Sequence, residues 1–374
     1  MYCQIIITGK CNFACSYCMQ KEKKNVTVKN DDLDKICDFI INLFKRDKNN
    51  NVNSVSICGG EPLLHMEIIN HIITKLNNEA LKNNIKIIYE VSTNASLIDE
   101  KIINFFEVNE ITPYVGFDGI AASQNLNRKC KVNKDSYEQV FRNLKLIYKR
   151  PKLKDKLIIN SVITANNVKF LYESFKFLYD NFTESKITLN IAYNSDWNKN
   201  GLSVFYNELI KIGKLYYEIL QTTNYSINII DSQIFESLNP SNARDNYCGG
   251  GKDSFSITVN GDILPCGNFT STGIGEEKIK IGNIYDGISE QFINKFKMEI
   301  VKVNDPDCQT CLFNSRCRRF CPFTRYMAGS KETEISEKFC EISKMLIMAT
   351  DKIMEDFYNK NPDLFLKKYK QKNQ

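Results

Sequence analysis

The sequence is poor in histidine, has no long apolar run and carries little net charge, and each of these features narrows the range of functions. Only two of the 374 residues are histidine, His65 and His71, which leaves few imidazoles to complete a zinc site. No run of about 18 apolar residues occurs, so no membrane-spanning helix is expected. The net charge is +6, with Lys and Arg dispersed among Asp and Glu. We therefore expect no nucleic-acid partner.

The N-terminal stretch MYCQIIITGKC has neither a charged leader nor a long apolar segment. No signal peptide is predicted from it, and a cytoplasmic location is the expectation. Thiols are kept reduced in the cytoplasm. The 14 cysteines of the chain therefore need a role other than disulfide formation, and metal binding is the usual one.

Strand and helix patterns alternate through the first 235 residues. Apolar runs typical of buried strands occur at residues 4–8, 52–58, 85–92, 111–117, 157–164 and 186–193. Segments with helical spacing of apolar residues separate these runs. The alternation predicts an α/β fold with a parallel sheet. Six units are fewer than the eight of a closed barrel, so we expect a partial (β/α)6 TIM-like barrel.

The pattern changes after about residue 235, where Gly, Asn, Pro and Ser cluster in SLNPSNARDNYCGGGKD and cysteine becomes dense. We expect a barrel over residues 1–235, a small cysteine-rich domain with a β-hairpin and helices over 236–345, and a C-terminal helix and tail over 346–374. The stretch SFSITVNGDILPC predicts the hairpin. Its Asn–Gly turn requires a positive φ at Gly261.

Ten of the cysteines fall into spaced groups. The first group is Cys11, Cys15 and Cys18, spaced C-x3-C-x2-C directly after the first strand. The second and third groups are Cys248 with Cys266, and Cys308, Cys311, Cys317 and Cys321 with Cys340 downstream. The remaining cysteines, Cys3, Cys37, Cys58 and Cys130, are expected to be ordinary buried or partly buried residues. Cys58 lies beside the predicted site.

A group of three cysteines leaves one metal position unexplained, because a closed zinc or cluster site takes four protein ligands. A zinc site completed by a distant histidine is one alternative. With Tyr17 before the last cysteine, the trio resembles the fingerprint of the radical S-adenosylmethionine (SAM) superfamily. The resemblance implies a [4Fe–4S] cluster whose open iron binds the amine and carboxylate of SAM.

Further motifs resemble those of the same superfamily. CGGEPLL follows the second strand, and the resemblance implies that Gly59, Gly60, Glu61 and Pro62 form the edge that receives the SAM amino group. GFDG and NLNRK resemble its Asp–Gly turn, here at Asp118, and a downstream Arg. The resemblance implies that Arg128 meets the SAM carboxylate, a role suited to a guanidinium.

Three more positions concern the expected SAM pocket. Ser92 and Asn94, in the STN sequence that ends the third strand, are expected to line the same pocket. Relatives often carry a Ser that touches the ribose where this chain has Gly116, so that contact is not expected here. Taken singly, each of these motifs is also compatible with a structural turn.

The seven cysteines from Cys248 to Cys340 match the spacing of the SPASM domain, an extension of radical SAM enzymes that modify peptides and proteins. The resemblance implies one [4Fe–4S] cluster bound by Cys308, Cys311, Cys317 and Cys340. It implies a second bound by Cys248, Cys266 and Cys321, with one iron open or bound by Asp245 or a more distant ligand. The expected cofactors are therefore three [4Fe–4S] clusters and SAM. A zinc ribbon at residues 308–321 is the alternative.

The resemblance implies reductive cleavage of SAM to a 5′-deoxyadenosyl radical and oxidative modification of a ribosomally made peptide or protein, by a crosslink, thioether or related bond. An anaerobic sulfatase-maturase-like, formylglycine-generating enzyme is the main alternative. Those relatives carry an Asp after the cysteine that matches Cys266, where this chain has Gly267. A non-catalytic iron–sulfur electron carrier and a small-molecule dehydrogenating enzyme are further alternatives.

The implied partners are a peptide or protein substrate and a reductant such as flavodoxin or ferredoxin. The chain begins almost directly at the first strand, so recognition of a leader peptide is expected from a separate leader-peptide-binding protein or from another surface. No catalytic acid or base can be assigned from the sequence. His65 and His71 are expected to be helix-surface or packing residues.

Overall fold

The computed structural model describes residues 1–374 except 21–24, 47–51, 133, 240–248, 270–275, 302, 304, 318, 320, 331–333 and 371–374. Asp245 and Cys248 therefore lie outside the described residues. The chain divides into two compact units. Unit 1 consists of Met1–Phe117, Arg128–Ile159 and Gly249–Ile300, and unit 2 consists of Asp118–Asn127, Asn160–Cys248 and Val301–Gln374. The domain limits expected from the sequence remain a prediction.

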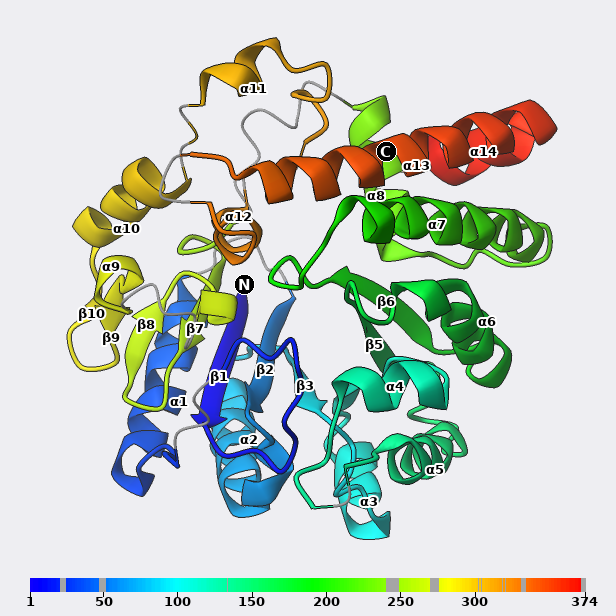
Figure 1. Cartoon of the computed structure of the whole chain (residues 1–374). Helices are drawn as coiled ribbons and strands as arrows, with labels where there is room; N and C mark the ends of the chain where they lie inside the picture. The colour runs from blue at the N-terminus through cyan, green and yellow to red at the C-terminus, as the bar shows by residue number, and fades with distance from the viewer. Residues whose placement is uncertain are drawn as a thin grey trace. The chain divides into compact units, whose positions relative to one another are not determined.

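The six strand–helix repeats expected from the sequence are present, which confirms the α/β class (Figure 1). The strands are β1 (Tyr2–Thr8), β2 (Asn53–Gly59), β3 (Ile87–Thr93), β4 (Thr112–Gly116), β5 (Ile158–Ile163) and β6 (Lys186–Ile191). The helices that follow them are α1 (Asn30–Lys45), α2 (Met66–Lys82), α3 (Glu100–Val108), α5 (Tyr137–Tyr148), α6 (Leu171–Asn181) and α7 (Lys199–Leu220). The pattern did not predict the short helix α4 (Ala121–Asn127).

The predicted hairpin joins the parallel sheet of unit 1. Its strands are β7 (Ser254–Ile257) and β8 (Asp262–Leu264), and β7 runs parallel to β1 with Tyr2 opposite Ser254. Gly261 has the expected positive φ, at 78°. Two short strands, β9 (Gly282–Asn283) and β10 (Gly287–Ile288), extend the same edge. The strand order in unit 1 is therefore β10-β9-β8-β7-β1-β2-β3-β4.

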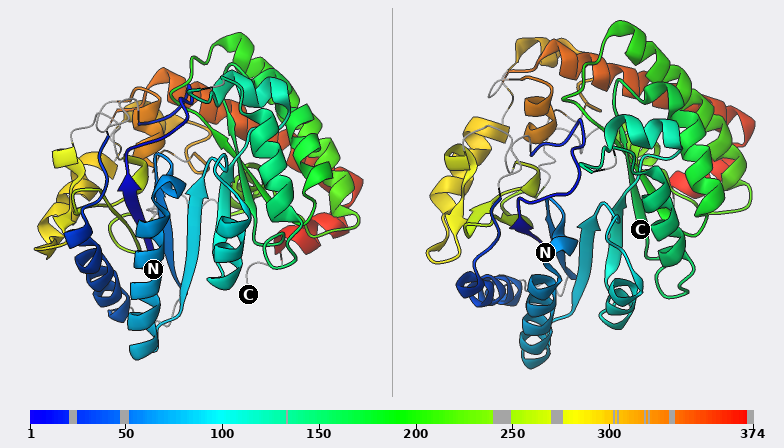
Figure 2. Two further views of the ribbon diagram at one scale, coloured as in Figure 1. Left: turned by 90° about the horizontal axis from the view of Figure 1, so that it is seen from below. Right: turned by 60° about the horizontal axis from the view of Figure 1, so that its bottom comes forward.

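The two faces of this sheet differ in character. Cys3, Ile5 and Ile7 of β1 have no exposed surface, and Figure 2 shows α1 and α2 alongside the strands. The hydroxyl of Tyr89 in β3 donates to Oδ1 of Asn77 in α2 at 2.8 Å, which assigns Tyr89 to the helix-covered face. Because side chains alternate between faces along a strand, the residues between these positions lie on the opposite, interior face.

The remaining elements of unit 1 are short. They are η1 (Pro62–His65), η4 (Gly267–Phe269), α9 (Glu276–Ile279) and α10 (Glu290–Phe296), and the π-helix η5 (Lys297–Val301) ends at the boundary with unit 2.

Unit 2 is built largely from long helices. In addition to the elements above it contains η2 (Val168–Phe170), α8 (Asn228–Leu238), α11 (Pro306–Thr310), α12 (Pro322–Met327), α13 (Glu337–Lys360) and α14 (Pro362–Lys370). A Cβ atom at Gly213 of α7 would lie 2.4 Å from Ile353 of α13, so the glycine lets the two helices pack closely. The buried carboxylate of Asp231 in α8 accepts hydrogen bonds from Tyr216 and Tyr369, both at 2.7 Å. These bonds connect α7, α8 and α14.

In the described part of the chain, no helix has both the length and the apolar character needed to cross a membrane.

Candidate functional site

The three N-terminal cysteines lie in a loop that follows the C-terminal end of β1. Cys11, Cys15 and Cys18 are each partly exposed. Phe13 between them has no exposed surface, and the loop backbone is hydrogen-bonded to residues 129–131. The backbone is therefore anchored, while the thiols remain accessible to a cluster.

The Gly-Gly-Glu-Pro segment packs closely against the start of this loop. A Cβ atom at Gly59 would lie 2.4 Å from the carbonyl oxygen of Thr8, and one at Gly60 would lie 2.2 Å from that of Lys10. The backbone N–H groups of Gly60 and Glu61 donate to the same two carbonyls, at 2.8 Å each. The glycines thus allow the end of β2 to bond directly to the chain that leads into the cysteine loop.

Glu61 has no exposed surface and connects β2 to β3. Its Oε1 accepts hydrogen bonds from Thr93 Oγ1 at 2.7 Å and from the Leu63 N–H at 3.1 Å. Its Oε2 accepts one from the Asn94 N–H at 2.7 Å. Burial raises the pKa of the carboxyl to about 7, against the opposing effect of these hydrogen bonds. Pro62 beside it is also buried.

Polar side chains connect the end of β3 to the first cysteine. Asn94 Nδ2 donates to Asn12 Oδ1 at 2.8 Å and lies 3.9 Å from Cys11 Sγ. The hydroxyl of Ser96 donates to Asn94 Oδ1 at 2.6 Å and accepts from Asn12 Nδ2 at 2.7 Å. This network holds Cys11 in place relative to the strand end. Ser92 lies two residues earlier in β3 and is partly buried.

Arg128 lies beside the cysteine loop. Its guanidinium carbon is 5.3 Å from the ring centroid of Tyr17, which immediately precedes Cys18, and the residue is only 7% exposed. A Cβ atom at Gly116 would lie 2.2 Å from Arg128 Nη1. The absence of a side chain at residue 116 therefore provides the space for the guanidinium. A guanidinium held here is suited to binding a carboxylate.

Asp118 belongs to unit 2. It has no exposed surface. Its Oδ1 accepts a hydrogen bond from the Val162 N–H at 2.9 Å, and its own N–H donates to Gln124 Oε1 at 2.9 Å. These bonds connect α4 to β5. Asp118 is thus part of the hydrogen bonding of unit 2, and its contact with SAM remains a prediction.

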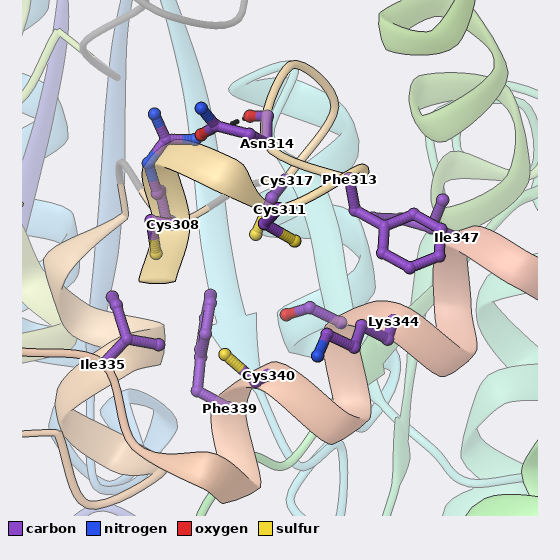
Figure 3. A pocket seen from close by; sticks show the side chains of 12 residues that line it. Cys308, Cys311, Phe313, Asn314, Cys317, Ile335, Phe339, Cys340, Lys344 and Ile347 are labelled. Carbon is purple, nitrogen blue, oxygen red and sulfur yellow. Dashed lines mark hydrogen bonds between the residues drawn. The ribbon is translucent and has the colours of Figure 1, made fainter. Parts of the chain in front are cut away.

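Four thiols of unit 2 line one pocket (Figure 3). They belong to Cys308, Cys311, Cys317 and Cys340. Burial raises the pKa of Cys317 to about 11 and also raises the pKa values of Cys308 and Cys340. Phe313, Phe339 and Ile347 contribute apolar lining. Four thiols around one partly apolar pocket supply the donor set of a [4Fe–4S] cluster. Among the described residues, no three Cys, His, Asp or Glu side chains form a group that could hold a single metal ion.

The other predicted cluster ligands belong to different units. Cys266 follows β8 in unit 1, and Cys321 is the N-cap residue of α12 in unit 2. Cys248 is outside the described residues. The second auxiliary cluster therefore remains a prediction.

The four cysteines outside the predicted sites are buried or partly buried, as expected. Cys3, Cys37 and Cys58 are buried, and Cys130 is partly exposed. Burial raises the pKa of each of the three buried thiols to about 12.

The two histidines have surface and packing roles, as expected. His71 Nε2 lies 2.8 Å from Asp34 Oδ1. His65 Nδ1 lies 3.2 Å from Glu67 Oε1.

Two polar features were missed by the sequence reasoning. Arg325 of α12 is only 1% exposed, and burial lowers its pKa to about 10 although the nearby Cys321 and Cys308 act in the opposite direction. On the interior face of unit 1, Ser56 Oγ donates to Glu90 Oε1 at 2.8 Å. The sequence contains a signal for the second feature, since Glu90 is the one charged residue in the strand sequence IIYEVST.

Comparison with known proteins connects these features to a family. The radical SAM superfamily matches residues 5–163. A cysteine-type anaerobic sulfatase-maturating enzyme of Clostridium perfringens is 24% identical over 343 residues, which cover 87% of this chain and 89% of that protein. The radical SAM cyclopropyl synthase TigE of Paramaledivibacter caminithermalis is 21% identical over 369 residues, which cover 92% of this chain and 72% of TigE.

A solved structure shows the same fold. The structure of native anSMEcpe with bound AdoMet and Cp18Cys peptide aligns with a TM-score of 0.75 and 21% identity, over 96% of this chain and 99% of that one. The likeness supports the expected partial barrel with a cysteine-rich extension. The matched range contains the cysteine trio, the Gly-Gly-Glu-Pro segment and Arg128. Residues 5–163 of this chain therefore form a domain of the radical SAM superfamily.

Proposed function

We propose that this chain is a radical SAM enzyme of the SPASM type, and that it oxidatively modifies a ribosomally made peptide or protein by a crosslink, thioether or related bond. The proposal depends on one observation above all. An anchored loop with three accessible thiols in unit 1 is accompanied by a pocket lined by four further thiols in unit 2. The first set fits a cluster with an open iron, and the second fits a fully ligated auxiliary cluster.

The residues around the cysteine loop fit SAM. Arg128 supplies a guanidinium for its carboxylate, and the edge from Gly59 to Pro62 receives its amino group. Tyr17, Ser92 and Asn94 complete the part of the proposed cofactor site that lies in unit 1. When bound, the cluster and SAM supply a 5′-deoxyadenosyl radical that removes a hydrogen atom from the substrate.

The chain's own contribution is to hold the strand ends rigid. Glu61 connects β2 to β3 through bonds to Thr93 and Asn94, and Asn94 connects β3 to the cysteine loop through Asn12. A site fixed by such supporting contacts keeps the reacting groups aligned.

The names of the similar proteins support a peptide or protein substrate. One relative is a sulfatase-maturating enzyme, another is a cyclopropyl synthase, and the aligned solved structure contains a peptide. We further propose that a reductant such as flavodoxin or ferredoxin supplies the electrons, and that a separate protein binds the leader of the substrate.

Formylglycine formation is the second candidate, favoured by the similarity to a sulfatase-maturating enzyme along most of both chains. Two observations weigh against it. Gly267 stands where those enzymes carry an Asp, and a Cβ atom at residue 267 would lie 1.6 Å from Gln4 Oε1. The space for a side chain at this position is therefore already occupied.

The test uses anaerobically reconstituted protein with SAM, dithionite and a peptide encoded beside the gene. We expect 5′-deoxyadenosine and a peptide mass lower by two hydrogen atoms. Cys15→Ala should abolish both, while Cys37→Ala, outside the predicted ligands, should retain both. Iron and sulfide without 5′-deoxyadenosine would instead indicate an electron carrier. Formylglycine from a Cys-type sulfatase peptide would support the second candidate.

A further inference from the structure

Glu90 is unusual among the strands of unit 1. Every residue of β1, β2, β3, β4 and β7 is described, and Glu90 is the only charged residue among them. Its neighbour Tyr89 lies on the helix-covered face, where its hydroxyl bonds to Asn77. Glu90 therefore lies on the interior face. A carboxylate placed inside a sheet is costly unless polar groups compensate for the loss of water.

The interior face is polar across four strands at the level of Glu90. The strand register places Ser256 of β7 opposite Gln4 of β1, Gln4 opposite Ser56 of β2, and Ser56 opposite Glu90 of β3. We call these four residues the polar row. Ser256 has no exposed surface, and its hydroxyl has no hydrogen-bond partner among the described residues. A buried hydroxyl without a partner calls for an explanation, and a bound polar group is one.

The polar row lies between two predicted cluster-binding segments of unit 1. The loop of Cys11 follows the C-terminal end of β1, whereas Gly267 lies against Gln4, nearer the start of the same strand. Cys266 is close enough to Tyr2 to contribute to the raised pKa of the Tyr2 hydroxyl. The polar row is therefore the polar surface that lies between these two segments.

Glu90 is held by a hydrogen bond from the neighbouring strand β2. Ser56 Oγ donates to Glu90 Oε1 at 2.8 Å. Ser56 is 1% exposed, whereas Glu90 is partly exposed. The buried hydroxyl of Ser56 thus holds one oxygen of a carboxylate that keeps some access to water.

We propose that Glu90 is the proton acceptor of the oxidation in this site, and that Ser56 positions its carboxylate. The inference rests on the proposed function. The substrate loses one hydrogen atom to the 5′-deoxyadenosyl radical, which becomes 5′-deoxyadenosine. It then loses one electron to a one-electron acceptor of the iron–sulfur class and one proton to Glu90. For a thioether product, a C–H and an S–H bond break, a C–S bond forms, and the proton comes from the thiol.

The first variant is Glu90→Gln, which keeps the size of the side chain but removes its basicity. Hydrogen abstraction precedes proton transfer, so 5′-deoxyadenosine should form at the wild-type level. The amount of modified peptide formed per molecule of 5′-deoxyadenosine should fall about a hundredfold below the wild-type value. This is a usual contribution of a positioned base. Peptide affinity of the SAM-loaded, unreduced enzyme should be unchanged. Glu90→Asp should recover part of the product yield, because it retains a carboxylate.

The matched control is Glu355→Gln on α13, where the glutamate side chain is 61% exposed and pairs with Lys352. It should retain the wild-type product ratio. Ser56→Ala should slow turnover while Glu90 still accepts the proton. Iron content and thermal unfolding are measured for each variant to check that it folds.

The outcomes separate this inference from the proposed function. If Glu90→Gln forms as much modified peptide per molecule of 5′-deoxyadenosine as the wild type does, Glu90 is not the proton acceptor. Loss of peptide affinity in that variant would assign Glu90 to substrate binding and would also overturn it. Wild-type protein that forms 5′-deoxyadenosine but modifies no peptide would overturn the proposed function itself, and the inference with it.

Discussion

The guanidinium of Arg128 occupies the space that a side chain at Gly116 would need, since a Cβ atom there would lie 2.2 Å from Nη1. The two residues are neighbours in the fold although β4 ends at Gly116 and Arg128 follows α4. The conformation of the proposed SAM-carboxylate ligand therefore depends on a glycine.

Gly116→Ser should weaken SAM binding, because the new side chain displaces the guanidinium from its place over Tyr17. We expect an increase in Kd of about tenfold, equivalent to about 1.4 kcal/mol. Equilibrium dialysis of SAM against the reconstituted enzyme measures it. Gly201→Ser is the control, because the nearest atom to a Cβ there is 3.5 Å away. Unchanged SAM affinity in Gly116→Ser would show that the position of Arg128 does not contribute to SAM binding.

Glu61 should make the stability of the protein depend on pH. Burial raises its pKa from 4.5 to about 7 in the folded protein, so the folded state holds this proton more tightly than the unfolded state. The resulting stabilisation is complete below about pH 4.5 and is lost as the pH rises through about 7, with a total of about 3 kcal/mol.

Denaturant titration of wild-type protein and Glu61→Gln from pH 5 to pH 8 tests this pH dependence. Because the glutamine does not titrate, the stability advantage of the wild type over Glu61→Gln should shrink as the pH rises. If the free energies of unfolding of the two proteins change in parallel over this pH range, the pKa of Glu61 is the same in the folded and the unfolded state.

Gly267→Asp should destabilise the protein rather than create formylglycine activity. Its Cβ atom would lie 1.6 Å from Gln4 Oε1, and such overpacking costs about 1–3 kcal/mol. The double variant Gln4→Ala with Gly267→Asp should regain stability, because the obstructing amide is removed. Differential scanning calorimetry and incubation with a Cys-type sulfatase peptide provide the measurements. A stable single variant that makes formylglycine would reverse our preference between the two candidate functions.

Cys317→Ala should remove one cluster and leave the others in place. Its thiol is one of four that line the pocket in unit 2, so iron and sulfide should each fall by about four per chain. Cys37→Ala is the control, because Cys37 is buried between α1 and α2 and its thiol contacts the carbonyl of Ile72. An iron content in Cys317→Ala equal to that of the wild type would refute a cluster in this pocket.

The strands and most helices could be predicted because their signals are local. Buried strands read as apolar runs, and helices repeat their apolar residues with a period near 3.6. Helix α4 was missed because its sequence AASQNLN is short and largely polar. The parallel pairing of β7 with β1 was not expected, since it joins residues about 250 positions apart and no local periodicity reports such a pairing.

The candidate site, too, could be predicted from the sequence only in its local features. The cysteine spacings predicted the thiol ligands, because a few residues between thiols place them within reach of one cluster. The sequence did not indicate that the carboxylate of Glu61 is directed inward to three donors. It also did not indicate that Gly267 packs against Gln4.

By itself, the sequence determined the α/β class and the number and spacing of the cysteines, from which the metal-binding thiols and the kind of cofactor are predicted. These are properties of neighbouring residues and of thiol chemistry. Only the tertiary structure decided which polar groups share the interior face, because β7, β1, β2 and β3 come from distant parts of the chain. Their register brings Ser256, Gln4, Ser56 and Glu90 to one level, and that contact depends on the path of the folded backbone.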